Sequence, residues 1–410
     1  MNRKQFLMLV LALAILGGAG LVMYFKNVSE YRDSGSRIGA KILPGLRISE
    51  VAQVELRDAK TGVTLVRKEN HWIVKERDGY PADFKAISDL IIKLADLKVV
   101  QSDTANPAML PRVDLVEPGI AKDAGEKAEK GAGKDAGKNA GEGVGTRVEI
   151  KDSAGKTLAA LVLGRTVLKK DPGNPLPSAQ DGVPAGRYIR VLGDKEQVVV
   201  VSDPLSSASP PPGRWLDKDF AKIERIKTLT VSNDAGGWKI TRDLEWGQWK
   251  FAGGGGDLDA SSAVGAVNAL GQLAFNDVAV GTKLEDEGKP ITVTAETFDN
   301  LVYTLRIAKR KTGDDYLLNV SVAGEPNRSR EAEKGEKAED KDRRDKDFAE
   351  SRKRLELRAA RDKARSAWLY VVDAKQVAPL LKSRSDMVAK RKPAADKGGQ
   401  GPLTPPFPFR

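Results

Sequence analysis

One supersecondary unit occurs twice in this sequence, and the repeat limits the folds that the chain can adopt. In residues 54–97, three short stretches of alternating apolar and polar residues precede a segment whose apolar residues recur every three or four positions. The first pattern is typical of half-buried strands and the second of an amphipathic helix. Residues 226–273 repeat both patterns in the same order. Two copies of one unit indicate a tandem duplication.

The two copies match position by position. Counted from the predicted helix caps Asp83 and Asp259, the apolar helix residues fall at identical spacing: Ile87, Ile91, Leu94 and Leu97 in the first copy, and Ala263, Val267, Leu270 and Leu273 in the second. Each helix is followed by a strand-rich half, with predicted strands at 148–150, 158–163, 188–191 and 198–201, and again at 291–293, 301–305, 368–371 and 377–381. The predicted fold class is α+β, with two tandem repeats of antiparallel sheet and a packed amphipathic helix in each.

The N-terminal segment 6–25 contains no charged residue. A helix of about 20 apolar residues spans the roughly 30 Å hydrocarbon core of a bilayer. Signal peptides have apolar cores of about 7–15 residues that end at small residues, whereas Leu21, Val22 and Met23 continue this apolar run. The pattern therefore favours an uncleaved transmembrane helix over a signal peptide. Arg3 and Lys4 indicate that the N-terminus stays in the cytoplasm.

Composition excludes several kinds of chemistry. The chain of 410 residues is long enough for two cores, and it has no cysteine. Disulfides, thiolate zinc sites and thiol catalysis are therefore excluded. The only imidazole is that of His71, which removes most metal and Ser–His chemistry. Of the net charge of +11, a large part lies in the C-terminal tail, so no nucleic-acid partner is predicted.

Composition also predicts the segments of the chain. They are a cytoplasmic N-terminus (1–5), the transmembrane helix (6–25), a spacer (26–46), the first repeat (47–209) with a disordered insertion (121–145), a join (210–222), the second repeat (223–381) with a charged insertion (325–365), and a disordered basic, Pro-rich tail (382–410). The charged insertion is predicted to be a solvated helix or a fluctuating one. Phe348 and Leu355 are too few for a stable coiled-coil seam, so docking through this helix is the weaker alternative.

Several short runs carry a family resemblance. They are 48–54, Trp-Ile-Val at 72–74, Asp-Gly-Tyr-Pro-Ala-Asp-Phe at 78–84, Leu-Ala-Asp-Leu-Lys at 94–98 and Arg-Trp-Leu-Asp-Lys at 214–218. With these runs, nearly the whole region after the anchor resembles the bacterial domain-of-unknown-function 4340 family. The resemblance implies a membrane-anchored envelope protein, often encoded beside gliding-motility-type ABC-transporter components, and it implies no particular chemistry. The second repeat departs from the family at 253–256, where glycines replace the Asp-Gly-Tyr-Pro turn.

No catalytic, cofactor or metal site is predicted. A lone histidine such as His71 is typical of an exposed strand residue. Asp78, Tyr80 and Asp83 could form an acidic cleft, but a turn at Asp78 and a helix cap at Asp83 are the favoured interpretation. The pair Asp217 and Asp219 could do acid–base work or hold a cation. Solvated charges, beside a Trp215 that plugs the join between the repeats, are favoured there.

Glycine and tryptophan clusters in the second repeat also allow two interpretations. A phosphate-binding loop at 253–256 would need a following Lys-Ser or Lys-Thr, which is missing, so a Gly-rich turn is favoured. Trp238, Trp246 and Trp249 could stack on a sugar or an aromatic ligand. Their alternation places Trp238 and Trp249 in the core and leaves Trp246 exposed at a hairpin turn.

The sequence therefore predicts a non-enzymatic binding or scaffolding protein. It is expected in the bacterial inner membrane as a single-pass protein with periplasmic or extracytoplasmic domains, accessory to an ABC-type transport complex. One alternative is a direct binder of anionic envelope polymer or lipid through the Trp246 hairpin and the basic tail. Another is a hydrolase that uses the Asp78/Asp83 or Asp217/Asp219 carboxylates. The predicted partner contacts are Tyr80, Trp246, Lys390, Arg391 and Lys392.

Overall fold

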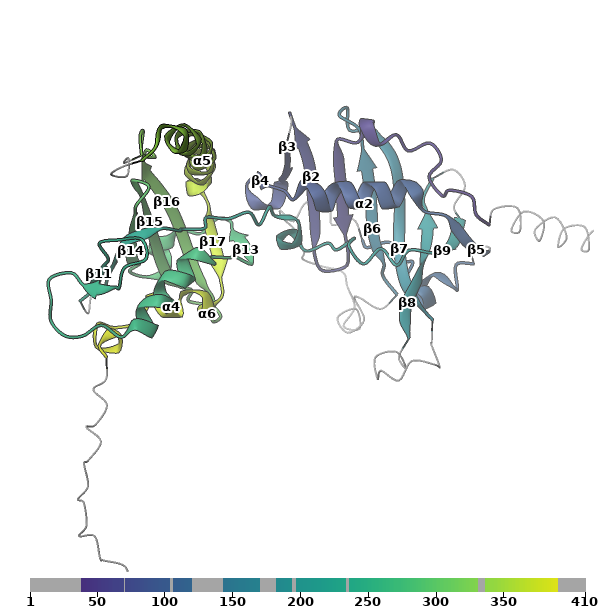
Figure 1. Ribbon diagram of the computed structural model, residues 1–410. Coiled ribbons are helices and arrows are strands. Elements are labelled where there is room, and N and C mark those ends of the chain that lie inside the picture. Colours follow the sequence, from purple (N-terminus) through teal and green to yellow (C-terminus); the bar gives the residue numbers. More distant parts are fainter. Residues whose placement is uncertain are drawn as a thin grey trace, which may run out of the picture. The chain divides into compact units, whose positions relative to one another are not determined.

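The computed structural model describes residues 38–69, 71–103, 106–119, 143–169, 182–193, 197–233, 236–330 and 336–389. The chain divides after Asp217 into two compact units (Figure 1). Each unit contains one antiparallel sheet and few helices, which confirms the predicted α+β class. The predicted anchor at 6–25 lies outside the described residues. Among those described, no helix combines the length and the apolar character that a membrane crossing requires.

Unit 1 contains a nine-stranded sheet in the order β4-β3-β2-β1-β6-β7-β8-β9-β5. Every neighbouring pair is antiparallel. The strands are β1 (Gln53–Arg57), β2 (Gly62–Lys68), β3 (His71–Val74), β4 (Tyr80–Pro81), β5 (Val99–Asp103), β6 (Thr146–Lys151), β7 (Thr157–Lys169), β8 (Val183–Val191) and β9 (Gln197–Val201). The sequence pattern predicted most of these strands and missed β4 and β5.

Helix α2 (Phe84–Asp96) crosses one face of this sheet (Figure 1). Its cap is Asp83, whose carboxylate accepts a hydrogen bond from the backbone N–H of Ala86 at 3.0 Å. The predicted apolar face packs into the core, and each buried aliphatic side chain contributes about 2 kcal/mol of transfer free energy. The buried residues are Ile87, Leu90, Ile91 and Leu94. After the helix, β5 pairs with β9 at the far edge of the sheet.

Unit 2 repeats this topology without an equivalent of β4. Its eight-stranded sheet has the order β12-β11-β10-β14-β15-β16-β17-β13. The strands are β10 (Ile226–Ser232), β11 (Trp238–Thr241), β12 (Lys250–Phe251), β13 (Asp277–Ala279), β14 (Ile291–Thr297), β15 (Leu301–Lys309), β16 (Tyr316–Gly324) and β17 (Leu369–Val372). As in unit 1, the strand that follows the helix returns to the edge and pairs with the last strand of the unit.

Helix α4 (Ala260–Gly271) is the counterpart of α2. Its cap Asp259 accepts a hydrogen bond from the N–H of Ser262 at 2.7 Å. Ala263, Ala266 and Leu270 are buried, whereas Val267 is only half-buried. Small residues therefore fill more of this interface than the matched spacing predicted.

The strand predicted at 377–381 is wrong. This segment forms the end of α6 (Ala374–Val377) and the 3₁₀ turn η7 (Ala378–Leu380). Pro379 lies near the start of that turn, and because proline has no N–H it cannot donate to a sheet ladder. The strand that pairs with β17 in the sheet is β16, which the sequence pattern missed.

Each unit ends in a short strap that returns to the N-terminus of its helix. In unit 1 the strap is 212–217: the O of Trp215 accepts from the N–H of Asp83 at 2.7 Å, and the N–H of Asp217 donates to the O of Pro81 at 2.9 Å. The two chains form an antiparallel bridge between Ala82 and Leu216. The strap thus fixes the entry to α2.

The strap of unit 2 is 385–389, and it makes the same contacts. The O of Met387 accepts from the N–H of Asp259 at 2.9 Å, and the N–H of Ala389 donates to the O of Asp257 at 2.8 Å. Leu258 and Val388 form the matching bridge. The duplicated unit therefore extends to Asp217 in the first copy and to Ala389 in the second.

These straps correct two predicted boundaries. Residues 210–217 belong to unit 1 rather than to a join, and Trp215 is buried inside that unit with its Nε1 donating to the O of Ser209 at 2.7 Å. Residues 382–389 belong to unit 2 rather than to a disordered tail, and Met387 is fully buried. The predicted insertion at 121–145 lies outside the described residues except for 143–145, where Val144 bridges Val116.

Candidate partner-binding groove

Helix α5 (Ala338–Ala364) occupies most of the predicted charged insertion and lies beside β16 (Figure 1). Its sequence consists mainly of Ala, Glu, Asp, Lys and Arg, several of which favour helix formation. Ion pairs one turn apart, such as Arg352 with Glu356 at 2.8 Å and Arg343 with Asp340 at 2.9 Å, add local support. Phe348 and Leu355 on the inner side are half-buried. The helix is therefore not part of the apolar core.

Polar side chains hold the C-terminal end of α5 against the body of unit 2. The most buried of them is Asp362, whose carboxylate accepts from the hydroxyl of Tyr303 at 3.4 Å. Burial raises the pKa of Asp362, although neighbouring arginines oppose the shift. Burial also raises the pKa of Tyr303 to about 12. Arg358 pairs with Glu224 at 3.2 Å, and Arg361 pairs with Asp219.

Ion pairs also hold the N-terminal end of α5. Arg330, on the segment that follows β16, contacts Glu336 at 2.7 Å and Asp345 at 2.6 Å. Glu336 also contacts Arg344 at 3.1 Å. The hydrogen bond with Arg330 lowers the pKa of the Glu336 carboxyl and raises the pKa of the guanidinium. Both ends of the helix are thus fixed, and its middle spans a gap.

That gap is a groove formed by two adjoining cavities of about 820 and 640 Å³. We call it the α5 groove. Its first part is lined by Arg328, Ser329, Arg330, Lys341, Asp345, Phe348, Ala349, Arg352, Lys353 and Glu356, and its second by residues 322–326 together with Arg352, Glu356, Ala359, Ala360 and Lys363. Arg352 and Glu356 line both parts, so the two cavities meet at these residues.

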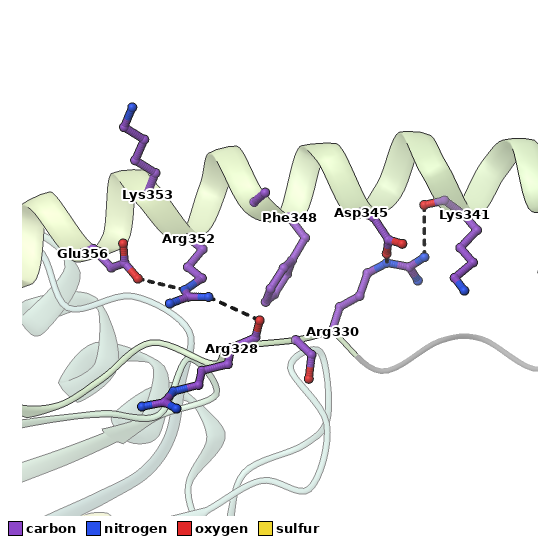
Figure 2. A pocket seen from close by; sticks show the side chains of 10 residues that line it. Arg328, Arg330, Lys341, Asp345, Phe348, Arg352, Lys353 and Glu356 are labelled. Atoms are coloured by element: carbon purple, nitrogen blue, oxygen red, sulfur yellow. Dashed lines mark hydrogen bonds and ion pairs between the residues drawn. The ribbon is translucent and has the colours of Figure 1, made fainter.

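Figure 2 shows how the side chains lie in the first part of the groove. The ring of Phe348 points from α5 toward the segment that carries Arg328 and Arg330. Arg352 donates to Glu356 at 2.8 Å and to the O of Arg328 at 3.4 Å, so it ties the two walls together. Lys353 points away from the groove. The groove therefore has an aromatic wall and fixed cations, which is the composition of a recognition surface.

Two of the predicted partner contacts lie in described residues, with opposite exposure. Tyr80 is fully buried, and its hydroxyl donates to the O of Asp217 at 3.3 Å. Its prediction as a surface contact was wrong, because β4 turns this side chain into the core of unit 1. Trp246 is 92% exposed at the β11–β12 hairpin, and the neighbouring Leu244 is 72% exposed. Lys390, Arg391 and Lys392 lie outside the described residues.

The other two tryptophans of that hairpin differ from one another. Trp238 is buried as predicted, and its Nε1 donates to the O of Lys382 at 2.9 Å. Trp249, which was predicted to be in the core, is half-buried with the guanidinium of Arg242 stacked 4.8 Å from its ring centroid. The pairing of β11 with β12 ends at Thr241 and Lys250. Trp249 therefore lies just outside the sheet and is only partly covered.

The candidate carboxylates lie in a turn, a helix cap, the strap of unit 1 and an ion pair. Asp78 is an exposed turn residue with a φ of 50°, and Asp83 caps α2. Asp217 belongs to the strap of unit 1, whereas Asp219 pairs with Arg361 in unit 2. His71 is exposed at the start of β3. Within the described ranges, no group of three or more His, Cys, Asp or Glu residues is placed to hold a metal ion.

The glycine run at 253–256 is a turn, as predicted. All four residues have a φ between 78° and 110°, a region that favours glycine. Arg384 donates to the O of Gly254 at 2.9 Å and to the O of Gly255 at 3.2 Å, and stacks 4.3 Å from the ring centroid of Phe251. The carbonyls of this turn are thus bound by the segment that leads into the strap of unit 2.

The α5 groove was missed by sequence reasoning, although part of its signal is present. Phe348, one of the two inner apolar residues of the charged helix, lies on the side that faces the groove. The opposite wall comes from the segment 322–330, and no periodicity links that segment to the helix. Comparison of the chain with protein-family models, with curated proteins and with solved structures finds no match. The family resemblance therefore stays a prediction.

Proposed function

We propose that this chain is a membrane-anchored binding protein that docks a partner protein in the α5 groove of unit 2. The groove is the observation that supports the proposal most. Its volume is that of a ligand-binding cleft, and its helical wall is fixed at both ends before any partner arrives. In unit 1 only residues 192–196 connect β8 to β9, too few for a helix like α5. The proposed binding site therefore belongs to unit 2 alone.

The membrane context of this proposal comes from the sequence. The apolar segment 6–25 supports an anchor in the bacterial inner membrane, with both units on the extracytoplasmic side. The family resemblance supports a role as an accessory subunit of an ABC-type transport complex. Asp83 caps α2 and Asp219 pairs with Arg361, so both carboxylates already have structural roles, and we favour binding over the hydrolase alternative. A non-enzymatic role remains part of the proposal.

The test is purification of the full-length chain from membranes in mild detergent, with one variant in the groove and one outside it. Phe348→Glu places a charge on the groove wall, whereas Leu357→Glu makes a similar change at a residue of α5 that is 65% exposed. We expect transporter subunits to co-purify with the wild-type and Leu357→Glu chains and to be lost with Phe348→Glu. Recovery of the wild-type chain alone, or equal capture by all three, contradicts the proposal.

A second candidate function rests on the exposed hairpin tip. Trp246 and Leu244 present apolar surface to solvent at one turn, as do residues that insert at a membrane interface or stack on a sugar. In this alternative the protein binds anionic lipid or envelope polymer directly. Trp246→Ala should then abolish co-sedimentation of the detergent-free extracytoplasmic chain with anionic vesicles or with cell-wall sacculi. Unchanged co-sedimentation would show that Trp246 does not contribute to binding, and would contradict this alternative.

A further inference from the structure

The insertion of α5 leaves part of β16 without a neighbouring strand. β16 pairs with β15 along its whole length, but with β17 only from Tyr316 to Leu318. In unit 1 the equivalent pairing of β8 with β9 continues from Arg187 to Val191, where the short connection begins. In unit 2 the chain instead leaves for α5 and rejoins the sheet at Leu369. Over the described residues, the outer half of β16 is therefore an open edge.

The hydrogen-bond pattern shows which groups face this edge. The N–H of Arg310 donates to the O of Asp315 at 3.1 Å, so these two residues form a hydrogen-bonded pair at the end of the β15–β16 ladder. Such pairs alternate along an antiparallel ladder, and no register shift interrupts this one. It follows that Val322 directs its N–H and C=O groups away from β15. The N–H of Gly324 follows the same pattern, whereas its φ of 92° takes its C=O out of the regular ladder.

Both residues line the α5 groove. Val322 is half-buried and Gly324 is exposed, so an incoming chain can reach their backbone groups. Nearer the middle of β16, residues 366–368 cover the edge. The side-chain amide of Asn319 holds them there by donating to the O of Ser366 at 2.8 Å and to the O of Trp368 at 3.1 Å. The open edge thus begins where the groove begins.

The charges of the groove favour an acidic occupant. Apart from Lys353, which points away, the first part is lined by four basic residues and two acidic ones, and the second part by two of each. Arg330 and Arg352 are neutralised by carboxylates, but Lys341 and Lys363 carry no ion pair within the part of the chain that the structure describes. α5 rises by about 33 Å between these two lysines at about 1.5 Å per residue.

We propose that the α5 groove binds an extended acidic segment of a partner protein by strand addition. The segment pairs with the backbone of Val322 and Gly324 as a further strand beside β16, and its carboxylates lie against Lys341 and Lys363. Main-chain hydrogen bonds to an open edge supply the affinity in this mode, while the flanking charges supply the specificity. The inference rests on the proposed function, since it names the chemistry of the partner that the groove docks.

The probe is a fluorescein-labelled synthetic peptide of about ten residues in which valine and glutamate alternate, titrated into the extracytoplasmic chain and followed by anisotropy. Two further peptides carry N-methyl groups on all valine amides or on all glutamate amides, which blocks one edge or the other. We expect only one methylated set to weaken binding, by about tenfold, because one edge of the peptide faces β16. Equal binding of all three peptides would overturn strand addition.

Variants test the same geometry from the side of the protein. Val322→Pro removes an N–H from the open edge, whereas Val322→Ala keeps it, so only the proline variant should lose affinity. Lys341→Glu and Lys363→Glu should each weaken binding of the acidic peptide. Lys346→Glu makes the same charge change on the same helix at an exposed residue that lines neither cavity, and should be silent. A peptide with lysine in place of glutamate should not bind the wild-type chain.

The outcomes separate this inference from the proposed function. If the acidic peptide does not bind, but Phe348→Glu still abolishes capture of transporter subunits, the groove docks a partner in another way and strand addition is wrong. If the peptide binds with the expected sensitivity to methylation, but Phe348→Glu leaves the capture unchanged, the edge is real and the proposed function fails. Binding of the lysine peptide as strongly as the acidic one overturns the charge assignment.

Discussion

Lys218, the first residue of unit 2, is exposed along part of its side chain, but its ammonium group packs against backbone carbonyls and an aromatic ring. Its Nζ donates to the O of Phe275 at 3.1 Å and to the O of Asn276 at 2.7 Å, and lies 4.1 Å from the centroid of the Phe275 ring. Burial lowers the pKa of Lys218 from its ordinary value of 10.5 to about 8, and the charge of Asp277 opposes the shift. The neighbouring aromatic trio of Phe220, Phe275 and Tyr370 supplies the apolar surroundings.

We predict that one lysine side chain of the folded protein titrates near pH 8. The measurement is a ¹³C NMR titration of the lysine Cε signals, and the signal is assigned by its absence in Lys218→Arg. Because the unfolded chain binds the proton up to a higher pH, stability should rise as the pH increases from about 8 toward 10.5. If the signal that Lys218→Arg removes titrates above pH 10, the prediction is wrong.

Asp362 gives a second prediction that concerns pH, with the opposite sign. Burial raises the pKa of this carboxyl above its ordinary value of 3.8, so between the two values the folded chain holds a proton that the unfolded chain has released. Stability should therefore fall as the pH rises from about 4, and Asp362→Asn should remove that part of the decline. Urea denaturation of both chains from acid to neutral pH measures it. Parallel curves for the two chains would contradict the prediction.

At the scale of elements, the two helix caps provide a matched experiment. Asp83 and Asp259 each accept one hydrogen bond from the first turn of their own helix. Replacing either by alanine should cost about 1 kcal/mol, whereas serine, which keeps an oxygen acceptor, should cost much less. Hydrogen exchange locates the effect: Asp83→Ala should raise exchange in α2 and Asp259→Ala in α4. Equal changes in both helices after one substitution would show that the caps do not act locally.

The helices could be predicted from sequence because their determinants are local. In α2 the cap Asp83 and the spacing of Ile87, Ile91 and Leu94 lie within one short segment, and the structure confirms them. The strands β5 and β13 were missed, since they are short and their partners β9 and β17 are far away in the chain. β16 was missed even though it forms a hairpin with β15, because its other neighbour β17 lies beyond α5 and no turn marks the end of the strand.

The candidate site was less accessible to sequence reasoning than the fold. The groove depends on the ion pairs of Arg330 with Glu336 and Asp345. It also depends on Val322 having no strand beside it on the α5 side among the described residues. Neither feature has a local pattern. The exposed position of Trp246 was predicted, because a hairpin turn between alternating residues is a local signal. A local sequence pattern therefore predicts which residues of a turn are exposed. It does not predict a cleft between segments that are far apart in the chain.

At the scale of the whole molecule, the straps define where one folding unit ends and the next begins. In unit 1 the strap contributes the buried Trp215 and two backbone hydrogen bonds to the entry of α2. In unit 2 the strap contributes the buried Met387 and the same two bonds to the entry of α4. Unit 2 also begins with a buried Phe220, which precedes its first strand. The core of each unit therefore includes residues from both ends of that unit.

We predict that fragments that end at the observed C-terminal limits fold, and that fragments that end at the C-terminal limits predicted from the sequence pattern are less stable. Residues 38–217 and 218–389 keep both straps, whereas 38–209 lacks Trp215 and 218–381 lacks Met387. Loss of a large buried side chain costs about 2–5 kcal/mol, a large fraction of the stability of a domain. Urea denaturation should show cooperative unfolding of the two complete fragments at clearly higher denaturant than their shortened partners. If each shortened fragment were as stable as its complete partner, the straps would be accessory segments, and the duplicated unit would end at its last strand.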